Sequence, residues 1–296
     1  MVRTEPSQGL NPGSIPGRVI AMKHTDTKFL KNSQYKNVKN LSARFALYDF
    51  SYPKVNFYDQ ALKALKLSGS EKILELGCGD GKVLVNLKKN RHTGSLVGSD
   101  LSKGMYSESV KICKKEKLPI KFVEASADKL PFEDSSFDVV LAFFMIYHMP
   151  DIDLALKEWK RVLKPNGKLL VAIGSEKNLA NRKKLTVPMK EKAGVTKKRF
   201  IDSISFESAP KMLGKYFSIK KKKLLEYDLR IPNSSFIIDA VESTKEFFEP
   251  KPKKSIWKSC MNDIKKKVQM EIKSKGYFHD IAKRGFYICE KVEKLV

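Results

Sequence analysis

Three glycines in five positions interrupt an apolar run at residues 73–84, which reads ILELGCGDGKVL. Glycine is the residue that a tight turn uses where φ is positive or where a ligand approaches the backbone closely. Glu75 lies just before this turn and Asp80 lies within it. Because two carboxylates repel a pyrophosphate and attract a cation, the turn predicts a binding site for a ligand that carries positive charge.

Two common nucleotide-binding motifs do not match the turn. The dinucleotide motif G-x-G-x-x-G would place a third glycine at position 82, where the chain has Lys82. A P-loop would close with Gly-Lys-Ser or Gly-Lys-Thr, whereas this turn continues with Gly-Lys-Val. The pattern therefore argues against an NAD site and against a P-loop.

A second acid follows at a spacing that nucleotide-binding folds use. Asp100 ends the segment SLVGSD, 25 residues after Glu75. An acid roughly 20 residues beyond the first strand bonds the ribose hydroxyls in such folds. S-adenosylmethionine combines a ribose with a sulfonium and an ammonium group. The acidic turn and Asp100 together therefore indicate S-adenosylmethionine as the ligand.

Short β-type runs alternate with helical segments around these residues. Such repetition is typical of a parallel sheet with helices on both faces. Two later strands are expected to add an antiparallel edge, which gives an α/β fold with a seven-stranded, mostly parallel sheet. The expected strands are 72–76, 95–99, 120–124, 137–142, 167–173, 216–225 and 284–291. The expected helices are 81–90, 103–116, 152–163, 234–248 and 255–275, the last two at one end of the sheet.

The expected organisation is one domain behind a disordered lead-in. Residues 1–35 carry Pro, Gly, Ser and Asn without an apolar period, which predicts disorder. Met22 within them is a second candidate for the translation start. Residues 36–296 are expected to form a single domain. Its parts are N-terminal helices (36–70), a cofactor-binding core (71–175), and a C-terminal part (176–296) that completes the sheet and the substrate side.

Composition narrows the class of protein. No apolar run approaches the roughly 20 residues that span a bilayer, and the four scattered cysteines form no disulfide or zinc pattern. A cytoplasmic protein without a metal site is therefore expected. The oligomeric state is left open.

The net charge of +25 raises nucleic acid as a partner. Only nine of the 58 basic residues are arginine, however, and arginine is the residue that phosphate-binding proteins favour. The basic segments 182–199 and 251–267 are expected to be solvated faces. If they do bind a ligand, an anionic substrate or RNA is the expected partner.

Five sequence blocks carry a family resemblance. They are ILELGCGDG, GSDLSKGM (98–105), SADKLPFEDSSFDVV (126–140), YHMPD (147–151) and EWKRVLKPNGKLLVA (158–172). In this order they resemble the class I, Rossmann-like S-adenosylmethionine-dependent methyltransferases, of the methyltransferase type 11 domain. The similarity is to the small-molecule group that includes ubiquinone and menaquinone biosynthesis methyltransferases, and it covers residues 71–174. It implies methyl transfer from S-adenosylmethionine to an O, N or C nucleophile of a small molecule.

The resemblance also implies cofactor contacts at particular positions of this chain. Glu75, Gly77 and Gly79 are expected to line the methionine end of the cofactor. Asp100 is expected to hold the ribose, and Leu101 to lie against the adenine.

The adenine site departs from the family pattern. An Asp or Asn usually follows the third strand, precedes an Ala and contacts the adenine amino group, whereas this chain has Ser126 before Ala127. The contact is therefore expected from the Ser126 hydroxyl or from Asp128. Cys78 and Phe143 complete the set of expected cofactor contacts.

Methyl transfer requires alignment of a nucleophile more than it requires catalytic groups. His148 follows the fourth strand at the edge of the sheet where ligands bind, and is a candidate general base. Tyr147 beside it is a candidate for orienting a substrate hydroxyl. The competing interpretation makes both residues packing groups. An aromatic cluster is either a lid over the substrate or part of the core: Phe45, Tyr48, Phe50, Tyr52, Phe57 and Tyr58.

Two alternatives to a small-molecule methyltransferase stay open. An RNA-modifying methyltransferase is favoured by the charge and opposed by the segment AFFMIYH, which stands where base-methylating enzymes often carry N/D-P-P-Y. A non-catalytic cofactor-binding module is favoured only by the departure at Ser126.

Overall fold

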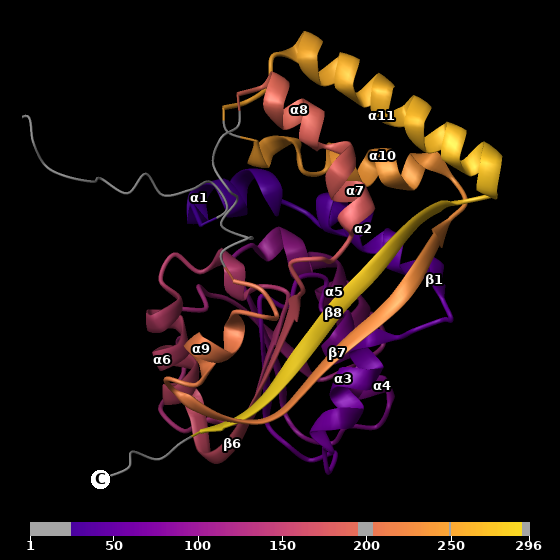
Figure 1. Ribbon diagram of the computed structural model, residues 1–296. Coiled ribbons are helices and arrows are strands. Elements are labelled where there is room, and N and C mark those ends of the chain that lie inside the picture. The colour runs from indigo at the N-terminus through magenta and orange to yellow at the C-terminus, as the bar shows by residue number, and fades with distance from the viewer. Residues whose placement is uncertain (1–24, 195–203, 249, 292–296) are drawn as a thin grey trace, which may run out of the picture.

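Eight strands form a single sheet in the computed structural model, which describes residues 25–194, 204–248 and 250–291 (Figure 1). The strand order is β1-β7-β8-β6-β5-β2-β3-β4. The strands are β1 (Ser51–Tyr52), β2 (Ile73–Leu76), β3 (Leu96–Asp100), β4 (Ile120–Glu124), β5 (Phe137–Phe143), β6 (Leu163–Gly174), β7 (Phe217–Ile231) and β8 (Phe278–Lys291).

The sheet is mostly parallel, as the sequence predicts. Strands β4, β3, β2, β5 and β6 pair in parallel, whereas β8 is antiparallel to both β6 and β7. The sequence-based expectation of seven strands is wrong by one, because the two-residue strand β1 pairs with Leu229 and Asp228 of β7. The antiparallel strand also lies inside the sheet rather than at its edge. Its run 284–289 is buried on both faces, which an edge position would not provide.

Strands β7 and β8 are longer than their predicted segments 216–225 and 284–291. Their added halves run past the parallel core towards a separate group of helices (Figure 1). In these halves polar and apolar residues alternate, and the apolar ones, such as Leu229 and Ile231, are buried. The predicted segment 216–225 included the lysines 220–223, which are exposed within an otherwise continuous strand, but ended before the alternating residues 226–231.

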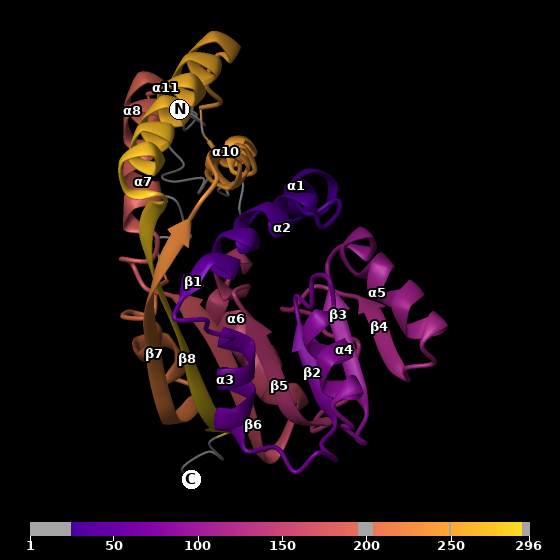
Figure 2. The same cartoon turned by 90° about the vertical axis from the view of Figure 1, so that its right-hand side faces the viewer.

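Helices cover both faces of the parallel strands (Figure 2). On one face Phe57 and Leu84 pack with strand residues such as Leu141. On the other face Trp159 packs with residues such as Val171 and donates its indole N–H to the carbonyl of Ala127 at 2.8 Å. The first face carries α3 (Phe57–Leu65), α4 (Lys82–Lys89) and α5 (Lys103–Lys115), and the second carries α6 (Ile152–Val162) and α9 (Ala209–Leu213).

A third hydrophobic core lies between the long strands and a helical cap. Ile237, Trp257 and Ile264 pack there against Tyr227 and Leu229 of β7. The two C-terminal helical segments are confirmed, and residues 180–192 add two short helices that the Lys- and Asn-rich sequence did not predict. The cap consists of α7 (Ala180–Leu185), α8 (Val187–Lys192), α10 (Ser234–Glu242), the short turn Lys245–Phe247 and α11 (Lys254–Lys275).

The N-terminal segment corrects one expectation. Disorder was predicted for residues 1–35, but residues 27–34 are helical, and the buried Gln34 donates from Nε2 to the carbonyl of Ser243 at 3.1 Å. Local composition did not predict this, because the contact joins residues 209 positions apart. Residues 1–24, including Met22, lie outside the described residues. The segment comprises α1 (Thr27–Phe29), η1 (Leu30–Gln34), α2 (Lys39–Phe45) and η2 (Ala46–Phe50).

Among the helices that the structure describes, none combines the length and the apolar character that crossing a bilayer requires.

Candidate active site

A cavity of about 1060 Å³ lies at the carboxyl ends of β2, β3 and β5. Open α/β sheets bind their ligands at this edge. The N-terminal segment and the start of α3 complete its wall, and β8 contributes Arg284. Typical pockets for one small ligand measure about 300–1,000 Å³, so this cavity has room for a cofactor and a second small molecule.

The glycine turn forms the floor of the cavity. Gly77 and Gly79 have φ values of +57° and +55°, which favour glycine. A Cβ atom added at Gly77 would also lie only 3.0 Å from the Cβ of Met145. The positive φ values confirm that the turn needs glycine at these positions, and both glycines line the cavity.

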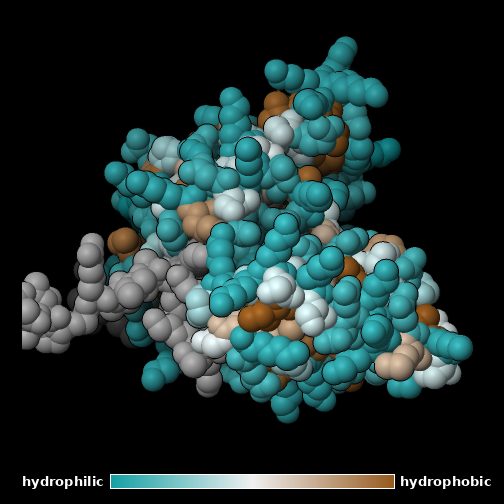
Figure 3. Space-filling view, turned by 90° about the horizontal axis from the view of Figure 1, so that it is seen from above, coloured by the Kyte–Doolittle hydropathy of each residue, from teal (hydrophilic) through white to brown (hydrophobic). Residues whose placement is uncertain are grey.

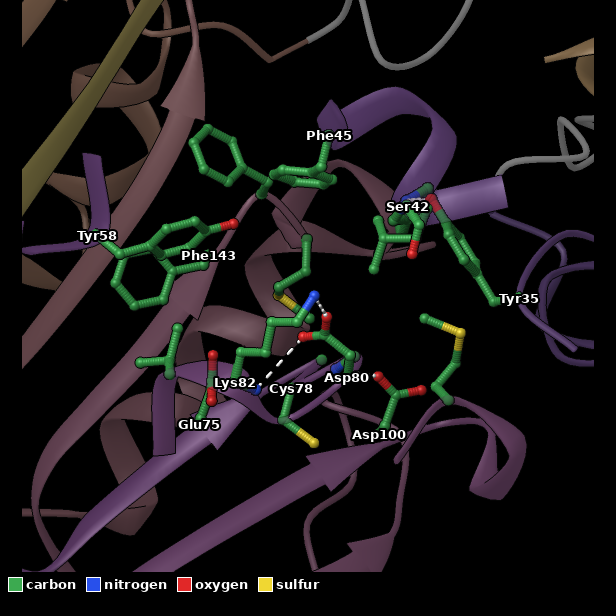
Figure 4. A pocket seen from close by; sticks show the side chains of 18 of the residues that line it. Tyr35, Ser42, Phe45, Tyr58, Glu75, Cys78, Asp80, Lys82, Asp100 and Phe143 are labelled. Carbon is green, nitrogen blue, oxygen red and sulfur yellow. Dashed lines mark hydrogen bonds and ion pairs between the residues drawn. The ribbon is translucent and has the colours of Figure 1, made fainter. Parts of the chain in front are cut away.

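Three carboxylates surround this turn (Figure 4). Glu75 is 3% exposed, and its Oε2 has no hydrogen-bond partner among the described residues. Burial, together with the charges of Asp80 and Asp100, raises the pKa of Glu75 well above its usual value. Asp80 forms an ion pair with Lys82 at 2.6 Å and is thereby partly neutralised. The unpartnered Glu75 carboxylate is the group that a bound cation would satisfy.

Asp100 is fixed at the end of β3 by backbone donors. Its Oδ2 accepts the N–H of Gly79 and its Oδ1 accepts the N–H of Ser102, both at 2.9 Å. Burial raises the pKa of Asp100 to about 6, although these hydrogen bonds act in the opposite direction. The side chain lines the cavity with its orientation set, which suits a carboxylate that holds ribose hydroxyls.

The remaining expected cofactor residues lie around the same cavity, with one exception. Leu101, Ser126 and Ala127 line it near Asp100, as do Cys78 and Phe143 elsewhere in the wall. Asp128 does not line the cavity. It accepts a hydrogen bond from the Ser126 hydroxyl and so orients that hydroxyl from behind.

The two catalytic candidates have different surroundings. His148 lines the cavity, and its Nε2 hydrogen-bonds to the hydroxyl of Tyr35 at 2.9 Å. Tyr147 does not line the cavity but packs against the core on the α6 side, and burial raises its pKa. The structure therefore places His148, and not Tyr147, in the wall of the cavity.

Tyr35 is a site residue that the sequence did not reveal. It follows η1, lines the cavity and accepts a hydrogen bond from Arg44 Nη2 at 3.1 Å. Burial raises the pKa of its phenol, and Arg44 opposes that shift. Tyr35 belongs to no local motif, and it lies in the segment for which disorder was predicted. Its contact with His148 joins residues 113 positions apart.

The aromatic cluster divides among the cavity wall, the core and the surface: Phe50 packs against the third core, and Tyr52 is exposed. Phe45, Tyr48 and Tyr58 line the cavity, where Tyr58 and Phe143 are 5.0 Å apart between ring centres. Phe57 lines it too but is fully buried in the core behind. Figure 4 shows Phe45, Tyr58 and Phe143 on one side of the cavity and Asp100 and Tyr35 on the other. The cavity thus has an aromatic wall of Phe45, Tyr58 and Phe143, and the carboxylate of Glu75 lies next to this wall.

Comparison with known proteins agrees with this geometry. Residues 74–171 match the family model described as a methyltransferase domain. A phthiotriol/phenolphthiotriol dimycocerosates methyltransferase of Mycobacterium ulcerans is 37% identical over 118 residues, a match that spans 39% of this chain but only 42% of that relative. A demethylmenaquinone methyltransferase of Staphylococcus aureus is 28% identical over 233 residues, 76% of this chain and 86% of the relative.

A solved structure shows the same fold. The phospholethanolamine N-methyltransferase 2 of Haemonchus contortus, in complex with phosphomonomethylethanolamine and S-adenosylhomocysteine, superposes with a TM-score of 0.52. The identity is 19%, and the match covers 91% of this chain and 60% of that one. The chain therefore has the class I, Rossmann-like methyltransferase fold, and residues 74–171 are similar to the methyltransferase domain family.

The residues present fit S-adenosylmethionine. The unpartnered carboxylate of Glu75 and the neighbouring Asp80 give the glycine turn the charge that an ammonium or sulfonium group requires. Asp100 offers a fixed acceptor for ribose hydroxyls, and Ser126, Ala127 and Leu101 offer a small polar and apolar surface for the adenine.

Proposed function

We propose that this protein methylates a small molecule that binds against the aromatic wall of the cavity. The observation that carries the proposal is that one cavity joins the acidic glycine turn to a wall of Phe45, Tyr48, Tyr58 and Phe143. A pocket with few polar groups and apolar walls is typical of small-molecule sites. The acceptor would be held by its apolar part, next to the cofactor residues.

The chemistry divides between the cofactor and the chain. S-adenosylmethionine, when bound, supplies a methyl group that its sulfonium already activates. Glu75, Asp100 and the glycine turn bind and orient the cofactor side. The aromatic wall excludes water and holds the acceptor in line, because approach and alignment supply most of what this transfer needs.

His148 is the proposed base for an acceptor that must lose a proton. It lines the cavity, and its Nε2 is bonded to Tyr35. A general base needs an unprotonated ring nitrogen, so in this proposal the Nε2–H of His148 donates to the Tyr35 oxygen, which also accepts from Arg44 Nη2. This arrangement fixes the imidazole ring beside the acceptor. Tyr147 is not proposed as a catalytic residue.

The test combines cofactor binding with turnover. Thermal unfolding of the full chain is measured with and without S-adenosylmethionine, and S-adenosylhomocysteine formation is then followed with reduced naphthoquinones, phenols and amines as acceptors. Ligand at 100 times its Kd should add about 2.7 kcal/mol of stability. We expect a shift and turnover in the wild type and neither in Asp100→Ala.

Two outcomes would contradict the proposal in different ways. A thermal shift without turnover on any acceptor would favour a non-catalytic cofactor-binding module. Turnover only with RNA, whose binding falls steeply with salt, would favour the RNA-modifying alternative, for which the charge of +25 is the supporting observation. Cytoplasmic location stays a prediction.

A further inference from the structure

Arg284 lies in the wall of the cavity because β8 runs against its neighbour β6. In the antiparallel register Arg284 stands opposite Gly174, the last residue of β6. The first half of β8 is therefore level with the edge of the sheet where ligands bind. Arg284 shares its face with Phe286 and Ile288, which pack in the core with α3. Its side chain lines the cavity although it is only 3% exposed.

Aromatic rings surround the Arg284 guanidinium. The guanidinium carbon lies 3.7 Å from the ring centre of Tyr48 and 4.7 Å from that of Phe57. Its hydrogen bonds go to the hydroxyl of Tyr227, from Nε at 3.0 Å and from Nη2. A guanidinium has five N–H donors, so Tyr227 uses only part of its capacity.

Within the described part of the chain, no carboxylate forms an ion pair with Arg284. The ion pair of its neighbour Lys283 with Glu226 does not include it, and the cavity acids Glu75 and Asp80 are not among its partners. A buried charge without an opposite charge is unfavourable, and cation–π contacts offset only part of that cost. The site is therefore suited to an anion supplied from outside the chain.

We propose that Arg284 binds an anionic group of the methyl acceptor, a carboxylate or a phosphate, while the aromatic wall holds the acceptor's apolar body. This inference rests on the proposed function and adds the charge and orientation of the acceptor. The carboxylates of the glycine turn attract the cationic cofactor and repel an anion, whereas Arg284 attracts the anion. The acidic turn and Arg284 thus select groups of opposite charge within one cavity.

The test compares matched aromatic probes on the full chain saturated with S-adenosylhomocysteine. Calorimetry measures the Kd of naphthoate against naphthamide, and of naphthyl phosphate against naphthol. Charge-assisted hydrogen bonds lead us to expect that at least one anion binds about 10 to 100 times tighter than its neutral partner. The pair that shows the larger ratio identifies the acceptor's anionic group as carboxylate or phosphate.

Variants assign the preference to Arg284. Arg284→Met should abolish the difference between anion and neutral probe, and Arg284→Lys should retain part of it. Arg230→Met is the matched control, because Arg230 also lies 3.7 Å from a tyrosine ring, that of Tyr52, but is exposed and does not line the cavity. It should keep the full preference.

Failure of this inference is separable from failure of the proposed function. Equal Kd values for anions and neutral probes in the wild type would overturn it, as would a preference that persists in Arg284→Met. In either case Arg284 would be a structural cation–π residue. If Arg284→Met does not fold, Arg284→Gln replaces it, and a preference for anions that persists in that variant overturns the inference. Loss of the thermal shift with S-adenosylhomocysteine in the wild type would instead contradict the cofactor site.

Discussion

At the scale of single residues, burial of the Asp100 carboxyl in the candidate site is expected to lower the free energy of unfolding at neutral pH. Burial raises its pKa from 3.8 to about 6, so the folded state holds the Asp100 proton more tightly than the unfolded state. Stability is therefore lost as pH rises from about 4 through about 6, by an amount on the order of 3 kcal/mol. The cofactor's ribose hydroxyls would compensate by bonding the ionised carboxylate.

The predicted consequence is that Asp100→Asn removes this pH dependence, although its amide accepts only one of the two backbone N–H groups. We expect the Tm of Asp100→Asn relative to the wild type without cofactor to be several degrees higher at pH 8 than at pH 5, because the wild-type carboxyl becomes neutral at pH 5. The same variant should lose the thermal shift with S-adenosylmethionine. Differential scanning calorimetry at a series of pH values measures both effects. A Tm difference independent of pH would refute the assignment of the shift to Asp100.

Glu75 should govern affinity for the cationic part of the cofactor. Its buried and unpartnered carboxylate has a raised pKa, so binding of a cation is coupled to loss of the Glu75 proton. We expect Glu75→Gln to weaken S-adenosylmethionine binding by about 10 to 100 times, the worth of one charge-assisted hydrogen bond, and to flatten the rise of affinity with pH. Calorimetric titration at several pH values provides the measurement. Glu108→Gln on the exposed side of α5 is the control and should bind as the wild type does.

At the scale of elements, the N-terminal segment depends on one helical glycine. A Cβ atom at Gly104 in α5 would lie 2.1 Å from the backbone carbonyl oxygen of Lys36. Alanine is otherwise favoured over glycine in a helix by up to about 1 kcal/mol. Gly104 is therefore expected to permit the close approach of the segment that carries Tyr35 to the cavity.

Gly104→Ala should leave the core folded and displace this segment. We expect faster tryptic cleavage after Lys31 and Lys36, weaker contact between Tyr35 and His148, and little change in the main unfolding transition. Mass spectrometry of a proteolysis time course tests this, with Glu108→Ala in the same helix as the control. Cleavage at the wild-type rate would show that the segment does not depend on the glycine.

At the scale of the whole molecule, charge repulsion is expected to limit stability. The net charge is +25, and hydrophilic side chains cover most of the face in Figure 3, with hydrophobic atoms only in small separate patches. Ion pairs such as Lys111 with Glu108 are exposed and contribute little. Repulsion among the basic side chains should therefore outweigh them at low salt.

We predict that the Tm rises when sodium chloride is increased from 20 to 200 mM, because the screening length falls to roughly 10 Å or less. The expected change is a few degrees, and sucrose at equal osmolality serves as the control for non-ionic effects. Thermal scans by circular dichroism measure it. A Tm that falls with salt would mean that favourable ion pairs dominate instead.

The sequence by itself determined the parallel core and most of the cofactor site. Glu75, Gly77, Gly79 and Asp100 stand at the ends of short buried strands, so their positions follow from local periodicity and from the rule that parallel strands present their carboxyl ends at one edge. Each of these strands is specified by its own few residues. Nothing distant is needed to place them together once the strand order is given.

Only the tertiary structure decided the acceptor side. Tyr35 reaches His148 across 113 residues of sequence, and Arg284 reaches the cavity because β8 enters the sheet in reverse between β6 and β7. The one sequence feature that could have indicated Arg284 is its charge at a position that alternates with the apolar residues Phe286 and Ile288. Long-range pairing, rather than local pattern, placed both side chains. For that reason local motifs led to the predicted cofactor residues in the cavity wall but not to these two.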